Sequence, residues 1–119
     1  MAKQESEQVE LLQGTLDMLV LRTLIFGPLH GYGIAKAVWQ TSNESLQIEF
    51  GSLYPALRRL ELKGWIASKW EISKTNRKAK TYRLTPAGRK QLVREQSKWT
   101  SFVDVVARVM SSEPKREES

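Results

Sequence analysis

The sequence predicts a mainly α-helical fold with one small β-hairpin: a winged helix-turn-helix followed by a C-terminal dimerisation helix. Three observations predict it. Apolar residues recur at helical spacing before residue 64, two alternating segments enclosing a polar turn follow, and a heptad pattern occupies the C-terminal part. A chain of 119 residues has the length of one domain with a modest core.

Composition excludes several classes of function. Cysteine is absent and His30 is the single histidine, so the sequence offers no disulfide, no thiolate metal site and no nucleophile with a matched base. We therefore expect no enzyme, no cofactor and no metal, and a capping or packing role for His30. The main apolar run, residues 16–26, contains two charges and is too short to span a membrane. The polar N-terminus is not a signal peptide, so a cytoplasmic protein is expected.

The first two elements are expected to be helices. Residues 11–26 are apolar on most sides of a helix, so this helix must be covered on most sides, in part by a second subunit. The dipeptide Gly27-Pro28 ends it. A second helix is expected over residues 31–41, because its apolar positions again recur at helical spacing.

A third helix is expected over residues 52–63. Its residues Leu53, Leu57 and Leu60 recur at i, i+4 and i+7 and therefore face the core. Residues 46–50 alternate between apolar and polar, which is typical of a very short strand. The exposed face of the third helix is expected to carry Tyr54, Pro55, Arg58, Arg59 and Leu62.

A β-hairpin follows the third helix. Strands are expected over residues 66–72 and 79–84, with the polar turn S-K-T-N-R-K at residues 73–78 between them. Trp65 and Trp70 flank the first strand and are expected to pack. The tip of this hairpin is expected to present four basic residues, namely Lys74, Arg77, Lys78 and Lys80.

The last element is expected to be one long helix. Thr85 is a suitable N-cap and Pro86 a suitable first residue, and the helix is expected to continue to about Met110. Steps of three and four residues give it a seam typical of helix pairing. The seam consists of Leu92, Gln96, Trp99, Val103, Val106 and Met110. The residues expected to form a dimer interface are Leu16, Leu19, Leu92, Trp99, Val103, Val106 and Met110.

The positive charge is concentrated in one window. The formal net charge is +6, and residues 58–90 contain eleven lysines or arginines but two acidic residues. Such a concentration is typical of a surface that contacts a phosphate backbone, so double-stranded DNA is the expected partner. Two other interpretations are open: a non-specific architectural nucleic-acid-binding protein, and a module whose hairpin binds an acidic protein. Membrane binding is not expected, since no basic amphipathic helix lies there.

Five motifs follow one another along the chain. They are L-x-G-T-L-D-x-L-V-L-x-x-L at residues 12–24, G-P-L-H-G-Y-G-I at 27–34, G-S-L-Y-P-A-L-R-R-L-E at 51–61, G-W-I at 64–66 and Y-R-L-T-P-A-G at 82–88. Together they resemble the PadR family of transcriptional regulators, in its short form with a single C-terminal helix. The resemblance implies a homodimeric repressor that binds a pseudo-palindromic operator. The domains expected are a flexible N-terminus (1–10), a DNA-binding domain (11–84), a dimerisation helix (85–110) and a disordered tail (111–119).

The resemblance also implies where DNA docks. The start of the third helix is expected to contact DNA through Gly51, Ser52, Tyr54 and Pro55. Arg58 or Arg59 is the candidate for a bidentate contact to guanine, the alternative being a solvated side chain. Tyr32 either contacts a phosphate or packs under the turn.

Trp99 has two interpretations. It lies on the seam of the last helix, where the copies from two subunits would face each other. Some multidrug-responsive PadR-like regulators resemble this arrangement and stack a flat aromatic effector between paired tryptophans. Trp99 is therefore expected either to fill the interface or to bind a small aromatic ligand.

Overall fold

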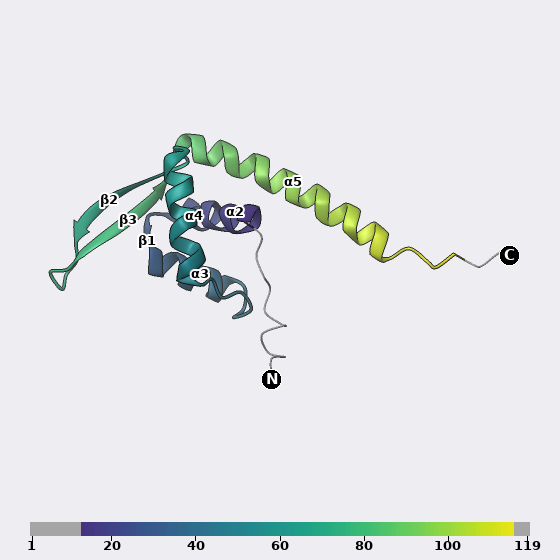
Figure 1. The fold of residues 1–119 in the computed structure, drawn as a ribbon, viewed down its shortest axis with the longest axis horizontal. Coiled ribbons are helices and arrows are strands. Elements are labelled where there is room, and N and C mark those ends of the chain that lie inside the picture. Colours follow the sequence, from purple (N-terminus) through teal and green to yellow (C-terminus); the bar gives the residue numbers. More distant parts are fainter. Residues whose placement is uncertain (1–12, 116–119) are drawn as a thin grey trace.

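A computed structural model describes residues 13–115 of the chain as a winged helix-turn-helix with a projecting last helix (Figure 1). The elements are α2 (Gln13–Thr23), the 3₁₀ turn η1 (Leu24–Phe26), β1 (Leu29–His30), α3 (Gly31–Thr41), α4 (Phe50–Leu62), β2 (Ile66–Ile72), β3 (Lys78–Leu84) and α5 (Pro86–Met110). This order confirms the predicted fold class. The predicted flexible segment 1–10, the first two residues of the first predicted helix and the last four residues of the predicted tail lie outside the described residues.

The three strands form one antiparallel sheet in the order β1-β3-β2. The hairpin pairs Ile66 with Leu84 at its base, so both side chains face the helices. The two-residue strand β1, which was not predicted, places Leu29 opposite Tyr82. We call the hairpin of β2 and β3, with its turn, the wing. Strand β1 joins the beginning of α3 to the wing, because His30 is followed directly by the first residue of that helix.

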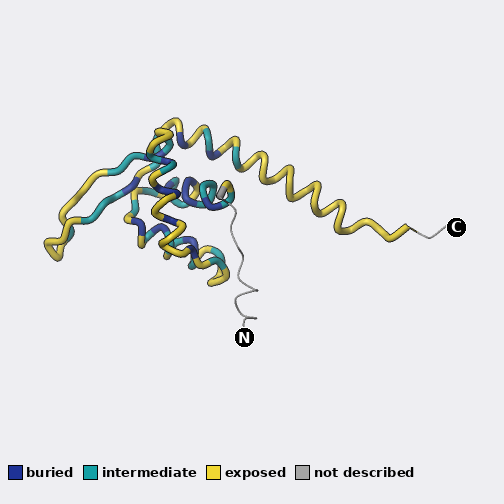
Figure 2. The backbone as a smooth tube through the Cα atoms, in the orientation of Figure 1, coloured by how far each residue is buried: buried dark blue, intermediate teal, exposed yellow. Residues whose placement is uncertain are grey.

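The core lies where α2, α3, α4, the base of the hairpin and the first turns of α5 meet, and the buried residues cluster there in Figure 2. The predicted core positions Leu53, Leu57 and Leu60 of α4 are fully buried, which confirms the assignment. Burial of each such side chain stabilises the fold by about 1.5–3 kcal/mol. The other large buried residues are Leu16, Val20, Leu21, Leu24, Ile34, Val38, Ile48, Ile66, Tyr82 and Leu92.

The helix ends follow from local chemistry. Gly64 has a φ of 77°, a conformation that favours glycine, and it ends α4 while the Trp65 N–H donates to the Leu60 carbonyl at 3.0 Å. Thr85 caps α5 as predicted, because its Oγ1 accepts from the Gly88 N–H at 3.0 Å. The same hydroxyl donates to the Gly64 carbonyl at 2.7 Å, so one side chain joins the end of α4 to the start of α5.

Two local expectations were wrong. Residues 46–50 form no strand: Ile48 fills the core between α3 and α4, whereas Phe50 begins α4. An alternation over three apolar positions is too short to distinguish a strand from an extended connection. Trp70 does not pack into the core but is 62 % exposed, because the hairpin extends beyond the body of the domain.

The last helix projects away from the domain (Figure 1). The molecule measures 73 × 39 × 22 Å, and its radius of gyration is 18.0 Å. A compact chain of this length would have about 13.5 Å. Leu92 is buried in the domain, but the residues of α5 beyond Glu95 are exposed (Figure 2). Within residues 13–115, no helix combines the length and hydropathy that a membrane span requires.

Candidate nucleic-acid interface

The buried residues of α4 determine which face of this helix is exposed. Leu53, Leu57 and Leu60 anchor the helix in the core, which leaves Tyr54 and Arg58 on the opposite side. Tyr54 is 47 % exposed, and no ion pair within residues 13–115 involves Arg58. The predicted contact residues Gly51, Ser52 and Pro55 are exposed at the start of the same helix.

A row of three aromatic rings crosses from α3 to α4. The ring centroids of Tyr32 and Phe50 are 6.4 Å apart, and those of Phe50 and Tyr54 are 5.9 Å apart. Tyr32 is 64 % exposed and therefore does not pack under the turn. Sequence reasoning missed Phe50, because it assigned this residue to a strand. Gly31 lets the row form, since a Cβ there would lie 2.5 Å from the Tyr54 Oη atom.

The two adjacent arginines of α4 have different surroundings. Arg59 Nη2 donates to Asp17 Oδ1 at 2.7 Å, and the side chains are 31 % and 13 % exposed. The expectation that Arg59 lies on the exposed face was therefore wrong: its side chain turns back toward α2. The pKa of Asp17 is raised, because burial of the carboxylate outweighs the attraction of Arg59. Arg58 is exposed.

The wing turn presents basic side chains to solvent. The Ser73 N–H donates to the Arg77 carbonyl at 2.8 Å, and Asn76 adopts the left-handed region with a φ of 62°. Lys74, Arg77 and Lys78 are exposed there, as predicted.

Lys80 lies on the face of the hairpin and not at its tip, which corrects the prediction. Its Nζ atom is 3.9 Å from Glu61 Oε1 of α4 and 5.7 Å from the ring centroids of both Trp70 and Tyr82. Ser68 Oγ also donates to Glu61 Oε2 at 2.6 Å, so Glu61 holds α4 against the wing.

A shallow pocket joins α4 to the wing. It has a volume of about 470 Å³ and is lined by Tyr54, Pro55, Arg58, Glu61, Lys80 and Tyr82. Burial raises the pKa of Tyr82 above its usual value of 10.0. The exposed face of α4 and this face of the wing therefore form one continuous surface.

The other face of the hairpin carries paired charges. Thr81 Oγ1 donates to Glu71 Oε1 at 2.9 Å, and Lys69 Nζ lies 3.4 Å from Glu71 Oε2. These contacts lower the pKa of Glu71, the hydrogen bond from Thr81 having the largest effect. His30 Nδ1 lies 3.1 Å from the Lys80 carbonyl, so this ring braces β1 against β3. Within residues 13–115, no group of three His, Asp or Glu side chains has metal-site geometry.

The predicted dimer residues divide into two groups. Leu16 and Leu92 are 5 % and 2 % exposed because they belong to the core of their own protomer, which corrects their assignment to a dimer interface. Leu19 is half-buried. The exposed apolar residues in the second half of α5 are Trp99, Phe102, Val103, Val105, Val106, Val109 and Met110. We call this surface the α5 apolar face.

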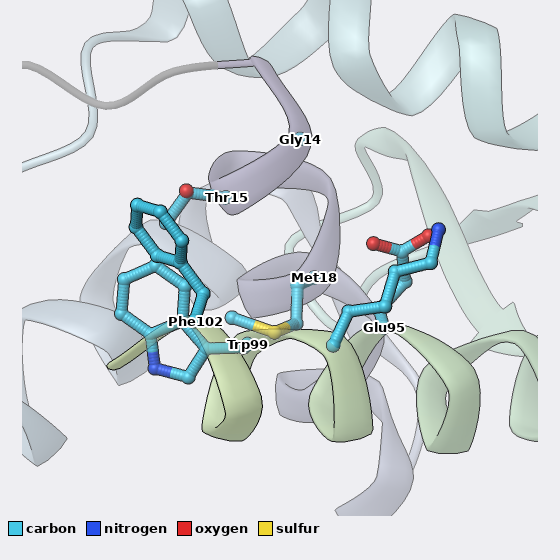
Figure 3. A pocket seen from close by; sticks show the side chains of 7 residues that line it. Gly14, Thr15, Met18, Glu95, Trp99 and Phe102 are labelled. Atoms are coloured by element: carbon cyan, nitrogen blue, oxygen red, sulfur yellow. The ribbon is translucent and has the colours of Figure 1, made fainter. Parts of the chain in front are cut away.

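A cavity of about 290 Å³ lies between α2 and α5 beside Trp99 (Figure 3). It is lined by Gly14, Thr15, Met18, Glu95, Lys98, Trp99 and Phe102. The ring centroids of Trp99 and Phe102 are 6.2 Å apart at an interplanar angle of 43°. Two aromatic rings and the thioether of Met18 therefore form an apolar wall that a flat ring can contact.

Comparison with known proteins identifies the family. The family model described as the transcriptional regulator PadR-like family matches residues 20–94. This chain belongs to that family. The match extends from residues 20–23 at the end of α2 to the first turns of α5, and so includes α4 and the whole wing.

Relatives and solved structures agree with this assignment. A transcriptional regulator from Clostridium thermocellum is 31 % identical with a TM-score of 0.74, over 81 % of this chain and 93 % of that chain. A PadR family regulator from Eggerthella lenta is 34 % identical with a TM-score of 0.73, over 85 % and 86 % of the two chains. An uncharacterized protein from Lysinibacillus sphaericus is 28 % identical over 82 % of this chain and 89 % of its own length.

Membership of the PadR-like family confirms three predictions. The chain is a transcriptional regulator with a winged helix-turn-helix, its family is one of DNA-binding regulators and not of enzymes, and its single long C-terminal helix fits the short form. The predicted contact residues stay predictions, and so do the dimer and the effector.

Proposed function

We propose that this PadR-like regulator binds a pseudo-palindromic operator as a homodimer and represses transcription in the cytoplasm. The observation that carries the proposal is the continuous surface formed by Tyr32, Tyr54 and Arg58 with the basic wing. A major groove admits an α-helix, and α4 is the helix whose exposed face meets this surface.

Each part of the surface has its own role. Arg58 of α4 is free of protein ion pairs within residues 13–115 and contacts guanine through its guanidinium. The Tyr54 hydroxyl donates to a phosphate, with Gly51 and Ser52 allowing the helix start to approach the backbone. The residues assigned to phosphate contacts are Tyr32, Lys74, Arg77 and Lys78. Arg59 and Lys80 position α4, through Asp17 and Glu61 respectively.

The α5 apolar face supports the homodimer. Its exposed side chains follow one another along the helix. Figure 1 shows that this helix extends beyond its own domain. A monomer rarely exposes so long an apolar stripe, and heptad spacing suits a second copy of the same helix. Two copies would place two α4 helices on two half-sites of one operator.

Selection from a random pool of DNA duplexes tests the function. An inverted repeat among the bound sequences supports a dimeric regulator, whereas a flat profile supports the non-specific architectural alternative. Arg58→Ala is expected to lose about 1–3 kcal/mol of preference at one base pair per half-site. Arg89→Ala, an exposed arginine of α5 outside the surface, is the matched control. Transcription in vitro from a promoter that carries the selected repeat then distinguishes repression from activation.

The cavity beside Trp99 is proposed as the effector site. Planar aromatic compounds are expected to quench the fluorescence of Trp99 and to weaken operator binding. The quenching should disappear in Trp99→Phe and persist in Trp39→Phe, which changes a half-buried tryptophan of α3. If the spectra of wild type and Trp99→Phe respond alike, Trp99 fills the interface instead.

A further inference from the structure

The wing carries an exposed apolar patch, formed by Trp70 and Ile72. These side chains neither pack into the core nor belong to the basic tip. Trp70 is 62 % exposed and Ile72 is 68 % exposed, although both lie within a regular strand. The hairpin extends beyond the helices in Figure 1, so nothing within residues 13–115 covers this part of β2. Large apolar side chains exposed together usually mark a contact surface.

Strand geometry places the patch on the same side as α4. Alternate residues of β2 share a face, so Trp70 and Ile72 continue the face that begins with Ile66 in the core and Ser68 beside Glu61. The patch therefore lies on the surface that also includes Tyr54 and Arg58, further out along the wing.

Two lysine side chains of the neighbouring strand flank the patch. Lys80 is paired with Trp70 across the hairpin, and Lys78 is paired with Ile72. The Nζ atom of Lys80 stands 5.7 Å from the centroid of the Trp70 ring. The acidic residue of the wing, Glu71, points to the opposite face, where Lys69 and Thr81 engage it. An apolar centre with a basic margin fits a polyanion that also offers apolar surface.

We propose that Trp70, supported by Ile72, lies against the deoxyribose rings of the minor groove next to the half-site bound by α4. This inference rests on the proposed function. With α4 in the major groove, the wing meets the neighbouring minor groove, whose walls are sugar rings. Apolar side chains are used in that groove, and Lys78 reaches a phosphate on its edge.

The dependence of DNA affinity on salt distinguishes the proposed Trp70 contact from contacts between basic residues and phosphates. An apolar side chain displaces no counterion from DNA, whereas each lysine on a phosphate contributes about −0.9 to the slope of log K against log salt. Trp70 is therefore expected to change affinity without changing the salt dependence.

Binding of the selected operator duplex at several salt concentrations, measured by fluorescence anisotropy, tests the inference. Trp70→Ala is expected to weaken binding about tenfold per wing at every salt concentration, the size of an aromatic contact with a nucleotide. Lys78→Ala is expected to reduce the magnitude of the slope by about 0.9 per wing. Phe26→Ala is the matched control, because Phe26 is an exposed ring with the Arg22 guanidinium 5.2 Å from its centroid, on η1. All three variants change exposed side chains, and thermal melting verifies that they fold.

A second experiment tests whether Trp70 contacts the minor groove. At the base pairs that hydroxyl-radical footprinting places under the wing, A·T pairs are replaced by G·C or by inosine·C, which lacks the minor-groove amino group of guanine. Wild type is expected to bind A·T and inosine·C alike and G·C more weakly, and Trp70→Ala to lose this difference. If Trp70→Ala binds all duplexes as wild type does, the inference is overturned and the patch belongs to a protein contact. If wild type itself selects no sequence, the proposed function fails first and removes the inference with it.

Discussion

Gly88 and Gly51 both lie in the first turn of a helix but have opposite surroundings. A Cβ at Gly88 would overlap the Trp65 carbonyl oxygen, whereas a Cβ at Gly51 would meet no atom within 4 Å. Gly88→Ala is therefore expected to lower the free energy of unfolding by about 1–3 kcal/mol. Gly51→Ala should leave it nearly unchanged. Urea unfolding of both variants compares them directly.

Gly51 also lies on the proposed DNA surface. If the start of α4 approaches the DNA backbone closely, Gly51→Ala should weaken operator binding although the free protein is as stable as wild type. Equal operator affinity of wild type and Gly51→Ala would contradict the close approach.

The pKa values of two carboxyl groups are expected to be shifted in opposite directions in the folded protein. The pKa of Asp17 is raised above its usual value of 3.8 because burial penalises the carboxylate, and that of Glu71 is lowered below 4.5 mainly by the Thr81 hydroxyl. Ionisation of Asp17 therefore lowers the free energy of unfolding as pH rises from 3.8 through the folded-state pKa of this group. Glu71 contributes stability that is present above 4.5 and is lost as pH falls through its folded-state pKa.

NMR titration of the side-chain carboxyl carbons measures both groups. Asp17→Asn is the control for assignment and should remove the signal assigned to Asp17. A midpoint of Asp17 at or below its usual value of 3.8 would contradict the dominance of burial over the Arg59 contact.

For single residues, the sequence predicted which side chains of α4 are exposed better than it predicted which side chains they contact. The motif around α4 pointed to Tyr54 and Arg58, which are exposed as expected. Arg59 was not separable from Arg58 by sequence, because its partner Asp17 is 42 positions away. An ion pair between distant segments leaves no local pattern.

Among the elements, α5 combines two functions along its length. Its first turns complete the core through Leu92, and its second half carries the α5 apolar face. A charge on that face is expected to separate the protomers without unfolding the domain, because Val106 contributes nothing to the buried core.

Val106→Glu is therefore expected to give a monomer of 13.7 kDa and to lose operator binding. Ser101→Glu changes an exposed residue off the heptad seam and should remain a dimer. Light scattering after size exclusion measures both masses. A Val106→Glu protein of doubled mass would show that another surface forms the dimer.

Long periodic elements were predictable and short ones were not. The expected bounds of α3, β2 and α5 agree with the structure, since each has either a repeated apolar spacing or clear end signals. β1 has two residues, too few for any periodicity, and exists because Tyr82 and Thr81 of β3 pair with it. Residues 46–50 show the reverse, an alternation without a strand.

For the molecule as a whole, the distribution of charge predicts which surface contacts DNA. The positive excess lies in residues 58–90, which include residues 58–62 of α4, the whole wing and the first turn of α5. Operator affinity is therefore expected to fall steeply with salt, by about 0.9 log units per log unit of salt for each phosphate contacted. Titration between low and moderate salt measures the slope. A slope near zero would show that this region is not the contact surface.

The projection of α5 has a mechanical consequence for the proposed dimer. Between Leu92, where the domain holds it, and Met110, the helix extends about 27 Å at 1.5 Å per residue, and thus acts as a lever. A tilt of about 5° at its root moves the far end by roughly 2 Å over that length. Small repacking between α2 and α5 would therefore change the separation of the two α4 helices, which must match half-sites about 34 Å apart.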